Sequence, residues 1–329
     1  MQLGACEQII GAHFGGVEPA RPDAGMPNTA GWIPDRDVNH DGTADVFVYD
    51  SAWTVGADPR AGTIQTWYMA RALHIGSEYL VDSQSTNLVT IFLPREIRAT
   101  GDFDGDGHPD LLWHDSSSGG VGVWTLAGAR RTSSVVVTDM AGSALSIVAP
   151  KRIDGAADFD GDGQIDLLEE DTVNGGLQIS TLTGWPPVAS GNLALHDAIS
   201  GLELSITPPL SFGGLGDLDG NGQADILVHD ASTGFVVVWL MNGPTRMSSE
   251  IIVEQANGGG DSAPPPWSIK SVGDFDGDRN TDLLFFNSSD STMQIWFMRR
   301  IRRMGFAAVV EGASLQSERV TLPFAIATD

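Results

Sequence analysis

The sequence has little cysteine, few basic residues and no long apolar run, and each shortage excludes a class of protein. Cys6 is the only cysteine among 329 residues, so no internal disulfide can form and an extracellular chain would need another stabiliser, such as a metal. No stretch approaches the ~18 consecutive apolar residues of a membrane-spanning helix. Residues 1–10 also lack the charged start and apolar centre of a signal peptide.

Basic residues are outnumbered by acidic ones. Lys and Arg total 18 against 43 Asp and Glu, and the formal net charge is -25. Such a surface repels phosphate backbones, so nucleic acid is excluded as a partner and cations are favoured. The hydrophobic fraction of 41% is sufficient for a packed core, which excludes a disordered chain.

Glycine and proline are abundant, and an acidic motif recurs five times between them. The 40 Gly and 17 Pro punctuate short runs of Val, Ile, Thr and Trp, a composition typical of many short strands. The five copies are DVNHDGTAD from Asp37, DFDGDGHPD from Asp102, DFDGDGQID from Asp158, DLDGNGQAD from Asp217 and DFDGDRNTD from Asp274. A repeat of this length indicates a fold built from similar units.

Each copy is followed by the same strand pattern. An apolar run such as LLWHD or ILVHD comes first, then a turn rich in Ser and Gly, then an alternating strand such as VVVWLM or MQIWFM. Trp67, Trp124, Trp239 and Trp296 occupy one equivalent position, and Ser180 replaces Trp in the third copy. A more variable strand and a strand leading into the next acidic loop complete about four strands per unit.

Four-stranded units with short antiparallel connections predict an all-β fold, a β-propeller of five blades, with six as the alternative. The C-terminal RVTLPFAIATD resembles the strand that precedes each acidic loop, so we expect it to complete the first blade and close the ring. Residues 31–329 then form one propeller domain, and residues 1–30 form an N-terminal extension.

The acidic loop has the ligand pattern of a calcium site. Oxygen-bearing side chains stand at positions 1, 3, 5 and 9, Gly at position 6 permits a sharp turn, and the carbonyl of position 7 is a further ligand. Clustered His or Cys, which zinc or copper would require, are absent from the pattern. The flanking strands and the lack of Glu at position 12 separate the loop from an EF-hand. The predicted Ca²⁺ ligands, for up to five ions, are Asp37, Asn39, Asp41, Thr43, Asp45, Asp102, Asp104, Asp106, His108, Asp110, Asp158, Asp160, Asp162, Gln164, Asp166, Asp217, Asp219, Asn221, Gln223, Asp225, Asp274, Asp276, Asp278, Asn280 and Asp282.

The five loops are not equal. Asn39 and Asn221 each remove one charge, and Arg279 stands where the fifth loop needs Gly, which favours a weak or empty fifth site. Extracellular calcium modules bind at ~10⁻⁴ to 10⁻³ M, so comparable sites would be empty in cytosol. We therefore expect an extracellular, periplasmic or cell-surface location.

The acidic loop with its trailing strands, above all GDLDGNGQADILVHDASTGFVVVWLMNG, resembles the FG-GAP/VCBS repeat family. The resemblance covers residues 30–329 and implies the calcium-binding blades of integrin α-subunits and of fungal and bacterial propeller lectins. It implies a calcium loop between the first two strands of each blade. The third unit departs from the pattern because it lacks Trp and carries Glu169 and Glu170 in a strand.

Signatures of common hydrolases, phosphate-transfer enzymes and redox enzymes are absent from the sequence. His114-Asp115 and His229-Asp230 look like acid/base pairs, but equivalent units carry Asp or Asn at the second position, which is typical of turn initiation. Trp53 and Trp185 lie off the strand pattern and are candidate stacking residues for a sugar. The leading hypothesis is a non-catalytic calcium-binding propeller for glycan recognition or surface adhesion. A protein-protein scaffold and an enzyme such as a polysaccharide lyase or cyclase remain alternatives; the ligand and oligomeric state stay open.

Overall fold

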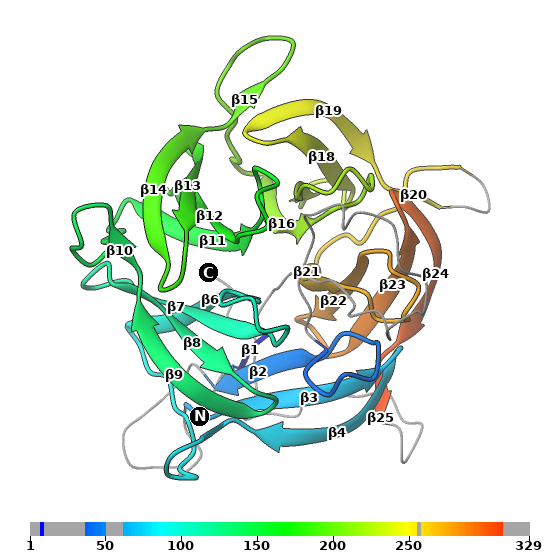
Figure 1. Cartoon of the computed structure of the whole chain (residues 1–329). Coiled ribbons are helices and arrows are strands. Elements are labelled where there is room, and N and C mark those ends of the chain that lie inside the picture. Colours follow the sequence, from blue (N-terminus) through cyan, green and yellow to red (C-terminus); the bar gives the residue numbers. More distant parts are fainter. Residues whose placement is uncertain (1–6, 10–36, 51–61, 255–257, 312–329) are drawn as a thin grey trace, which may run out of the picture.

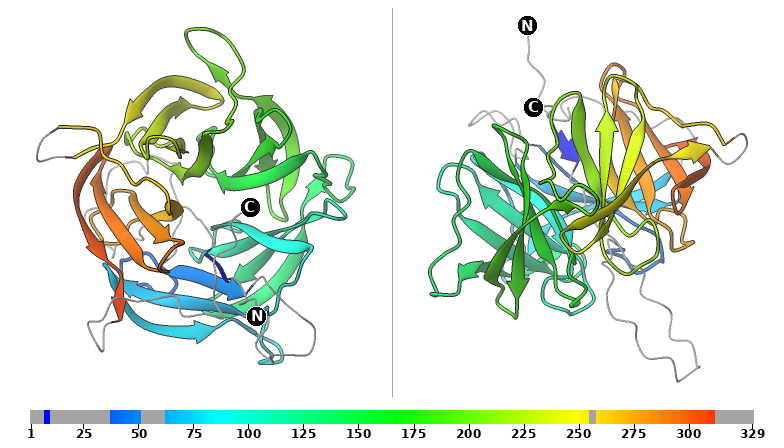
Figure 2. Two further views of the ribbon diagram at one scale, coloured as in Figure 1. Left: turned by 180° about the vertical axis from the view of Figure 1, so that it is seen from behind. Right: turned by 90° about the horizontal axis from the view of Figure 1, so that it is seen from above.

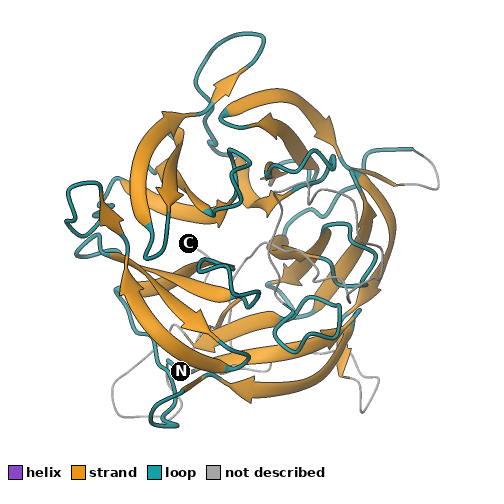
Figure 3. Ribbon diagram, viewed as in Figure 1, coloured by secondary structure: helices purple, strands orange, loops and turns teal. Residues whose placement is uncertain are grey.

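Short apolar runs separated by Gly and Asx turns form strands throughout the part of the chain that the structure describes. The computed structural model describes residues 7–9, 37–50, 62–254 and 258–311. These residues form five sheets of five strands each. The sheets are arranged as blades around a central axis (Figure 1, and from behind in Figure 2). They contain strands and loops and no helix (Figure 3). The prediction of an all-β, five-bladed propeller is confirmed.

Blades 2 to 5 share one topology of four antiparallel strands plus a short fifth strand at the outer edge. From the inner to the outer edge, the strands are as follows. Blade 2 contains β6 (Arg95–Gly101), β7 (Asp110–Asp115), β8 (Val121–Leu126), β9 (Arg130–Val136) and β5 (Val81–Asp82). Blade 3 contains β11 (Lys151–Ala157), β12 (Asp166–Asp171), β13 (Leu177–Thr183), β14 (Val188–Ala194) and β10 (Thr138–Asp139). Blade 4 contains β16 (Leu210–Gly216), β17 (Asp225–Asp230), β18 (Val236–Asn242), β19 (Thr245–Ile251) and β15 (His196–Asp197). Blade 5 contains β21 (Trp267–Gly273), β22 (Asp282–Asn287), β23 (Met293–Arg299), β24 (Arg302–Ala308) and β20 (Val253–Glu254).

The second strand is the most buried strand of blades 3, 4 and 5, and in blade 2 only β8 is more buried. All six residues of β22 are buried, because neighbouring blades pack against both faces of the sheet. The fourth strand is the least buried: β24 alternates between exposed and half-buried residues. This difference explains why the second strands read as continuous apolar runs while the fourth strands vary.

The short fifth strands join each blade to the one before it. Each continues from the fourth strand of one blade and pairs in parallel with the fourth strand of the next, as β5 does with β9 through Val81 and Arg130. We call β5, β10, β15, β20 and β25 (Val310–Glu311) the exchange strands. The last of them, β25, leaves blade 5 and pairs with β4 (Leu73–Tyr79) of blade 1, so it closes the ring at the outer edge.

Blade 1 consists of β1 (Glu7–Ile9), β2 (Val46–Asp50), β3 (Ile64–Ala70), β4 and β25. At its inner edge β1 pairs antiparallel with β2, so residues of the segment predicted as an N-terminal extension take part in this blade. The C-terminal residues expected to close the ring lie outside the described residues, and closure by them stays a prediction.

Apolar side chains from facing blades form the core. Trp67 and Met69 of blade 1, for example, pack in one cluster with Phe285 and Trp296 of blade 5. In the described ranges we find no helix that would be long and apolar enough to cross a bilayer.

Candidate metal centre

Each acidic loop connects the first and second strands of a blade, and the five loops recur around the ring (Figure 3). Neighbouring loops touch through their backbones. The Ala44 N–H donates to the Asp274 carbonyl at 2.8 Å, between the first and fifth loops, and the Ala224 N–H donates to the Asp158 carbonyl at 3.2 Å. The loops are thus anchored to one another as well as to their own blades.

The carboxylate at position 1 shapes the loop by accepting two or three backbone N–H groups. In the second loop, Asp102 Oδ1 accepts from Gly105 at 2.7 Å and from Asp106 at 3.0 Å, and Oδ2 accepts from Gly107 at 2.9 Å. Gly105 and Gly107 have φ of 76° and 85°, which side chains disfavour. The turn therefore requires positions 4 and 6 to be left-handed.

Two loops adopt the same turn without Gly at one of these positions. His40 at position 4 of the first loop has φ 59°, and Arg279 at position 6 of the fifth has φ 69°. The Arg279 N–H still donates to Asp274 Oδ2 at 2.8 Å. Arg279 therefore keeps the loop shape that its side chain disfavours.

The carboxylate at position 9 is buried and is held by two backbone donors. Asp110 Oδ2 accepts from the Phe103 N–H at 3.0 Å and Oδ1 accepts from the Leu126 N–H at 2.9 Å. The equivalent pairs of donors hold the other four residues at this position: Asp45, Asp166, Asp225 and Asp282. This carboxylate ties the start of the loop to the end of the third strand.

Burial raises the pKa of the position-9 carboxyls well above that of a free Asp. The other carboxylates of the same loop raise it further. The pKa rises to about 8 for Asp45 and Asp110, to about 7 for Asp166 and Asp225, and to about 9 for Asp282. Ionising these groups together without a cation is therefore unfavourable.

Positions 1, 3 and 9 converge in four of the five loops. In each, one oxygen from every carboxylate lies within 4.8 Å of the others; the groups are Asp102, Asp104 and Asp110; Asp158, Asp160 and Asp166; Asp217, Asp219 and Asp225; and Asp274, Asp276 and Asp282. The first loop has Asn39 at position 3, so Asp37 and Asp45 are its carboxylates at these three positions.

The predicted ligands at position 5 are not among these converging oxygens. Asp106 Oδ1 accepts the His108 N–H at 2.8 Å, and Asp162 and Asp278 make the same contact with Gln164 and Asn280. In the first loop Asp41 Oδ1 accepts from Thr43, and in the fourth the Asn221 amide donates to the Met241 carbonyl at 2.9 Å.

Side chains at position 7 connect the loop to the next hairpin. Gln223 Oε1 accepts the Gly243 N–H at 2.6 Å, Gln164 Oε1 accepts the Gly184 N–H, and Asn280 Oδ1 accepts the Arg300 N–H at 3.3 Å. The Thr43 hydroxyl donates to the Met69 carbonyl at 2.6 Å. His108 instead contacts His40 of the first loop, 3.1 Å between Nδ1 and Nε2.

The donor set fits a hard divalent cation. Ca²⁺ takes six to eight oxygens at about 2.3–2.6 Å, so two ligands on opposite sides of the ion lie about 5 Å apart. Three carboxylate oxygens within 4.8 Å of one another satisfy this geometry. A divalent cation would also compensate the negative charge that these carboxylates carry when they are ionised together.

The other candidates lie apart from the loops. Trp185 follows β13 and is 40% exposed, and Trp53 is outside the described residues. His114 and His229 are buried, with Nε2 2.7 Å from the Ile147 carbonyl and 2.9 Å from the Ala263 carbonyl. Burial lowers the pKa of both. Asp115 and Asp230 accept backbone N–H groups of the turns that follow them, as predicted for turn initiators.

Residues 102–169 match the model of the FG-GAP-like repeat, a span from the second acidic loop to β12. This match and the five blades confirm the resemblance to FG-GAP repeats: the chain is a five-bladed β-propeller that carries an FG-GAP-like repeat. No curated protein matches the chain by sequence.

Several solved structures are similar to the chain at low identity. The Tc holotoxin pore of Photorhabdus luminescens is 14% identical with a TM-score of 0.43; the match covers 93% of this chain and 12% of that one. An Agrocybe aegerita lectin that recognises non-reducing terminal N-acetylglucosamine is 16% identical with a TM-score of 0.42, covering 95% and 92%. A luciferin-regenerating enzyme is 11% identical with a TM-score of 0.42, covering 93% and 81%. Likenesses at this level identify neither a ligand nor a reaction for this chain.

Proposed function

We propose that the protein is a calcium-stabilised, non-catalytic recognition propeller. The convergence of three carboxylate oxygens within 4.8 Å in four equivalent loops is the observation that carries the calcium assignment. Bound calcium would compensate buried charges that lie between the inner and second strands, and so stabilise each blade. Extracellular calcium modules bind at about 10⁻⁴ to 10⁻³ M, and comparable affinity here would support an extracellular, periplasmic or cell-surface location.

The calcium assignment is tested by removing one carboxylate from each of two loops. We expect Asp104→Ala with Asp160→Ala to lower the melting temperature in millimolar calcium and to shrink the shift caused by EDTA. The control is Asp139→Ala, which removes an Asp that accepts backbone N–H groups of a turn outside the loops. This variant should melt lower by the same amount with calcium and with EDTA. Unchanged melting of the double variant in both conditions would refute the assignment.

A groove between blades 1 and 2 supports recognition of a glycan. It has a volume of about 520 Å³ and is lined by Ser77, Glu78 and Tyr79 near the end of β4, by Leu88, and by Arg130 of β9. An aromatic ring beside a carboxylate, a guanidinium and a hydroxyl offers one apolar face and several hydrogen-bonding groups. Sugar rings present the same combination.

Binding to a glycan array, competed by the free sugar, tests this assignment. We expect Tyr79→Ala to abolish the signal. Phe306→Ala should leave it unchanged, because Phe306 is an exposed aromatic residue on the fourth strand of blade 5, away from the groove. A protein partner captured without sugar competition would select the scaffold alternative. Turnover abolished by changes outside the calcium loops would select an enzyme.

A further inference from the structure

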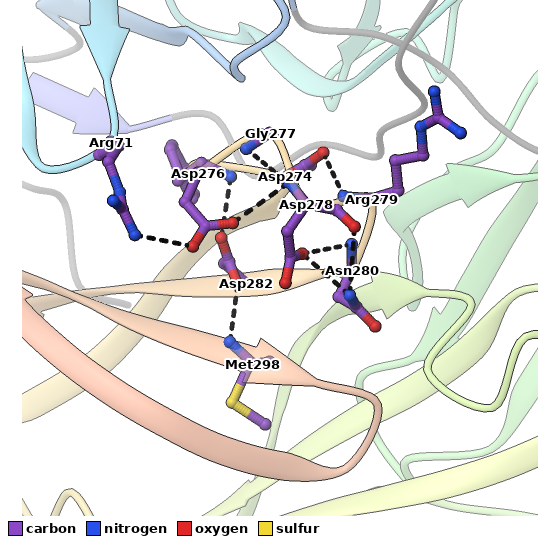
Figure 4. Close-up of polar contacts among 10 residues, drawn as sticks. Arg71, Asp274, Asp276, Gly277, Asp278, Arg279, Asn280, Asp282 and Met298 are labelled. Atoms are coloured by element: carbon purple, nitrogen blue, oxygen red, sulfur yellow. Dashed lines mark hydrogen bonds and ion pairs between the residues drawn. The ribbon is translucent and has the colours of Figure 1, made fainter. Parts of the chain in front are cut away.

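The fifth acidic loop receives a cation from its neighbouring blade. Arg71 lies in the turn between β3 and β4 of blade 1, and its Nη2 is 3.1 Å from Asp276 Oδ2 (Figure 4). The Arg71 side chain is 67% exposed and that of Asp276 is 12% exposed. The guanidinium therefore approaches the loop from solvent and meets a carboxylate that is mostly enclosed.

Asp276 is one of the three converging carboxylates of this loop. Together with Asp274 and Asp282 it presents oxygens that all lie within 4.8 Å of one another. A positive charge 3.1 Å from one of these oxygens repels a divalent ion placed among them. Arg71 also reduces the uncompensated negative charge that would attract the ion.

Arg71 has a left-handed backbone conformation in its turn, and in three other blades glycine occupies the equivalent position. Arg71 has φ 59°, while Gly128, Gly184 and Gly243 have φ of 59°, 69° and 57°. Those glycines present no side chain to an adjacent loop. Arg71 adopts a conformation that disfavours a side chain, and its guanidinium lies 5.4 Å from the centre of the Phe297 ring in blade 5.

Arg300 is the fifth residue at this turn position, with φ 55°. Its guanidinium extends toward Gly220 of the fourth loop, yet among the described residues it forms no ion pair with that loop. Arg300 thus offers a matched comparison, because it is the same residue type in the same turn without the contact to a carboxylate.

Arg71 and the fifth loop meet where blade 5 joins blade 1. The Ala44 N–H of the first loop also donates to the Asp274 carbonyl here. The Arg71–Asp276 pair therefore spans the junction between the last blade and the first, and it can hold this junction without a metal.

We propose that Arg71 is a tethered cation of the fifth loop, which weakens calcium binding there and holds the junction of blades 5 and 1 when calcium is scarce. The inference rests on the proposed calcium function. It makes the fifth loop at least ~10-fold weaker for calcium than the second and third loops, since an ion must displace or share Asp276 with the guanidinium.

The test compares Arg71→Gly with Arg300→Gly in the full chain, since glycine is the residue that three blades already use at this turn. Calcium affinity and stoichiometry are measured by isothermal titration calorimetry. In the wild type we expect a weak site besides the tighter ones, and in Arg71→Gly that site should tighten ~10-fold. Arg300→Gly should leave it unchanged. Adding Asp276→Asn to Arg71→Gly should remove the gain.

Melting gives a second readout that does not depend on the titration. Without calcium, Arg71→Gly should melt below the wild type and below Arg300→Gly, and saturating calcium should remove the difference. Wild-type calcium binding with no change in Arg71→Gly relative to Arg300→Gly would overturn this inference and leave the proposed function standing. Absence of calcium binding in every variant would overturn both.

Discussion

Blade 3 differs from its neighbours at the outer edge of the sheet. In blades 2, 4 and 5 an Arg of the fourth strand covers a Trp of the third and pairs with an acid in or next to the exchange strand. The three sets are Trp124, Arg131 and Asp82; Trp239, Arg246 and Asp197; and Trp296, Arg303 and Glu254. Arg303 also pairs with Asp261, beyond β20 in the chain. The guanidinium lies 4.8–5.2 Å from the ring centre in all three. This contact connects the exchange strand of one blade to the core of the next.

In blade 3 the Trp and the Arg are both replaced. Ser180 stands for the Trp and Ala189 for the Arg, while Asp139 remains on the exchange strand. Glu169 is buried beside Ser180, accepts from Gln178 Nε2 at 2.8 Å and lies 3.6 Å from Lys151 Nζ. The comparison teaches that a blade can form without the Trp–Arg–acid contact when a satisfied polar cluster fills its place.

The largest expected effect concerns the feature that blade 3 shares with the other blades, its buried loop carboxylate. Burial raises the pKa of Asp166 to about 7 and that of Asp282 to about 9, against 3.8 for an ordinary Asp. From about pH 4 upward the folded protein then binds more protons than the unfolded chain, so stability without calcium falls as pH rises to about 9. We expect the calcium-free melting temperature to fall by about 10 °C or more from pH 5 to pH 9.

The measurement is a thermal melt of dialysed, calcium-free protein across this range, with calcium-saturated protein as the control. Calcium should remove most of the slope, because the ion compensates the ionised carboxylates. A calcium-free melting temperature that rises between pH 5 and pH 8 would contradict the raised pKa values.

The second largest expected effect is a loss of stability when Trp239 of blade 4 is replaced by Ser, the residue that blade 3 carries at the equivalent position. Trp239→Ser should lower the free energy of unfolding by about 3–5 kcal/mol, because it removes a buried ring and leaves a cavity. Urea unfolding measures the loss, and Ser180→Ala in blade 3 is the control, expected to cost about 1 kcal/mol. Equal losses of unfolding free energy in the two variants would show that the Trp ring does not stabilise its blade more than the Ser of blade 3 does.

The third effect tests the polar cluster of blade 3. Glu169→Val introduces the residue that blades 1 and 4 carry at this position, Val48 and Val228. We expect a loss of about 1–3 kcal/mol, since Gln178 loses its acceptor and Ser180 keeps only Asn192. Adding Ser180→Ala should cost less than the two single changes together, because both remove the same contact. Full additivity would argue against a coupled cluster.

The smallest expected loss of stability distinguishes the roles of two neighbouring arginines, Arg302 and Arg303. Arg303→Ala should cost about 1 kcal/mol, because it removes the contact with Trp296 and the ion pair with Asp261. The adjacent Arg302 is exposed, and Arg302→Ala should stay within about 0.5 kcal/mol of the wild type. A loss of the same size in both variants would indicate a general charge effect.

The repeated pattern made much of this structure predictable. Five acidic motifs and an equivalent Trp indicated five blades, and the spacing within the motif indicated that positions 1, 3 and 9 would converge. The same spacing predicts a ligand at position 5, and this stays a prediction: Asp106 accepts a backbone N–H of its own turn and is not one of the three converging carboxylates. Such a local hydrogen bond leaves no trace in the motif.

Contacts between blades could not be predicted from the sequence. The exchange strands are two residues long, too short to show a period. Arg131 and Arg246 lie on the fourth strands against Trp rings, and no repeated motif in the sequence indicates this contact. Arg71 meets Asp276 across 205 positions of sequence, and only the ring closure makes them neighbours.

The exchange strands also bear on how many units such a ring can contain. Every sheet receives its outermost strand from the preceding blade, so each blade pairs with the next in the same way. Backbone pairing alone would therefore allow a ring with a different number of blades. The count of five must then be set by how the apolar side chains of facing sheets pack together. The number of blades thus depends on the volume of the side chains between the sheets. The pattern of strand pairing within each blade does not fix it.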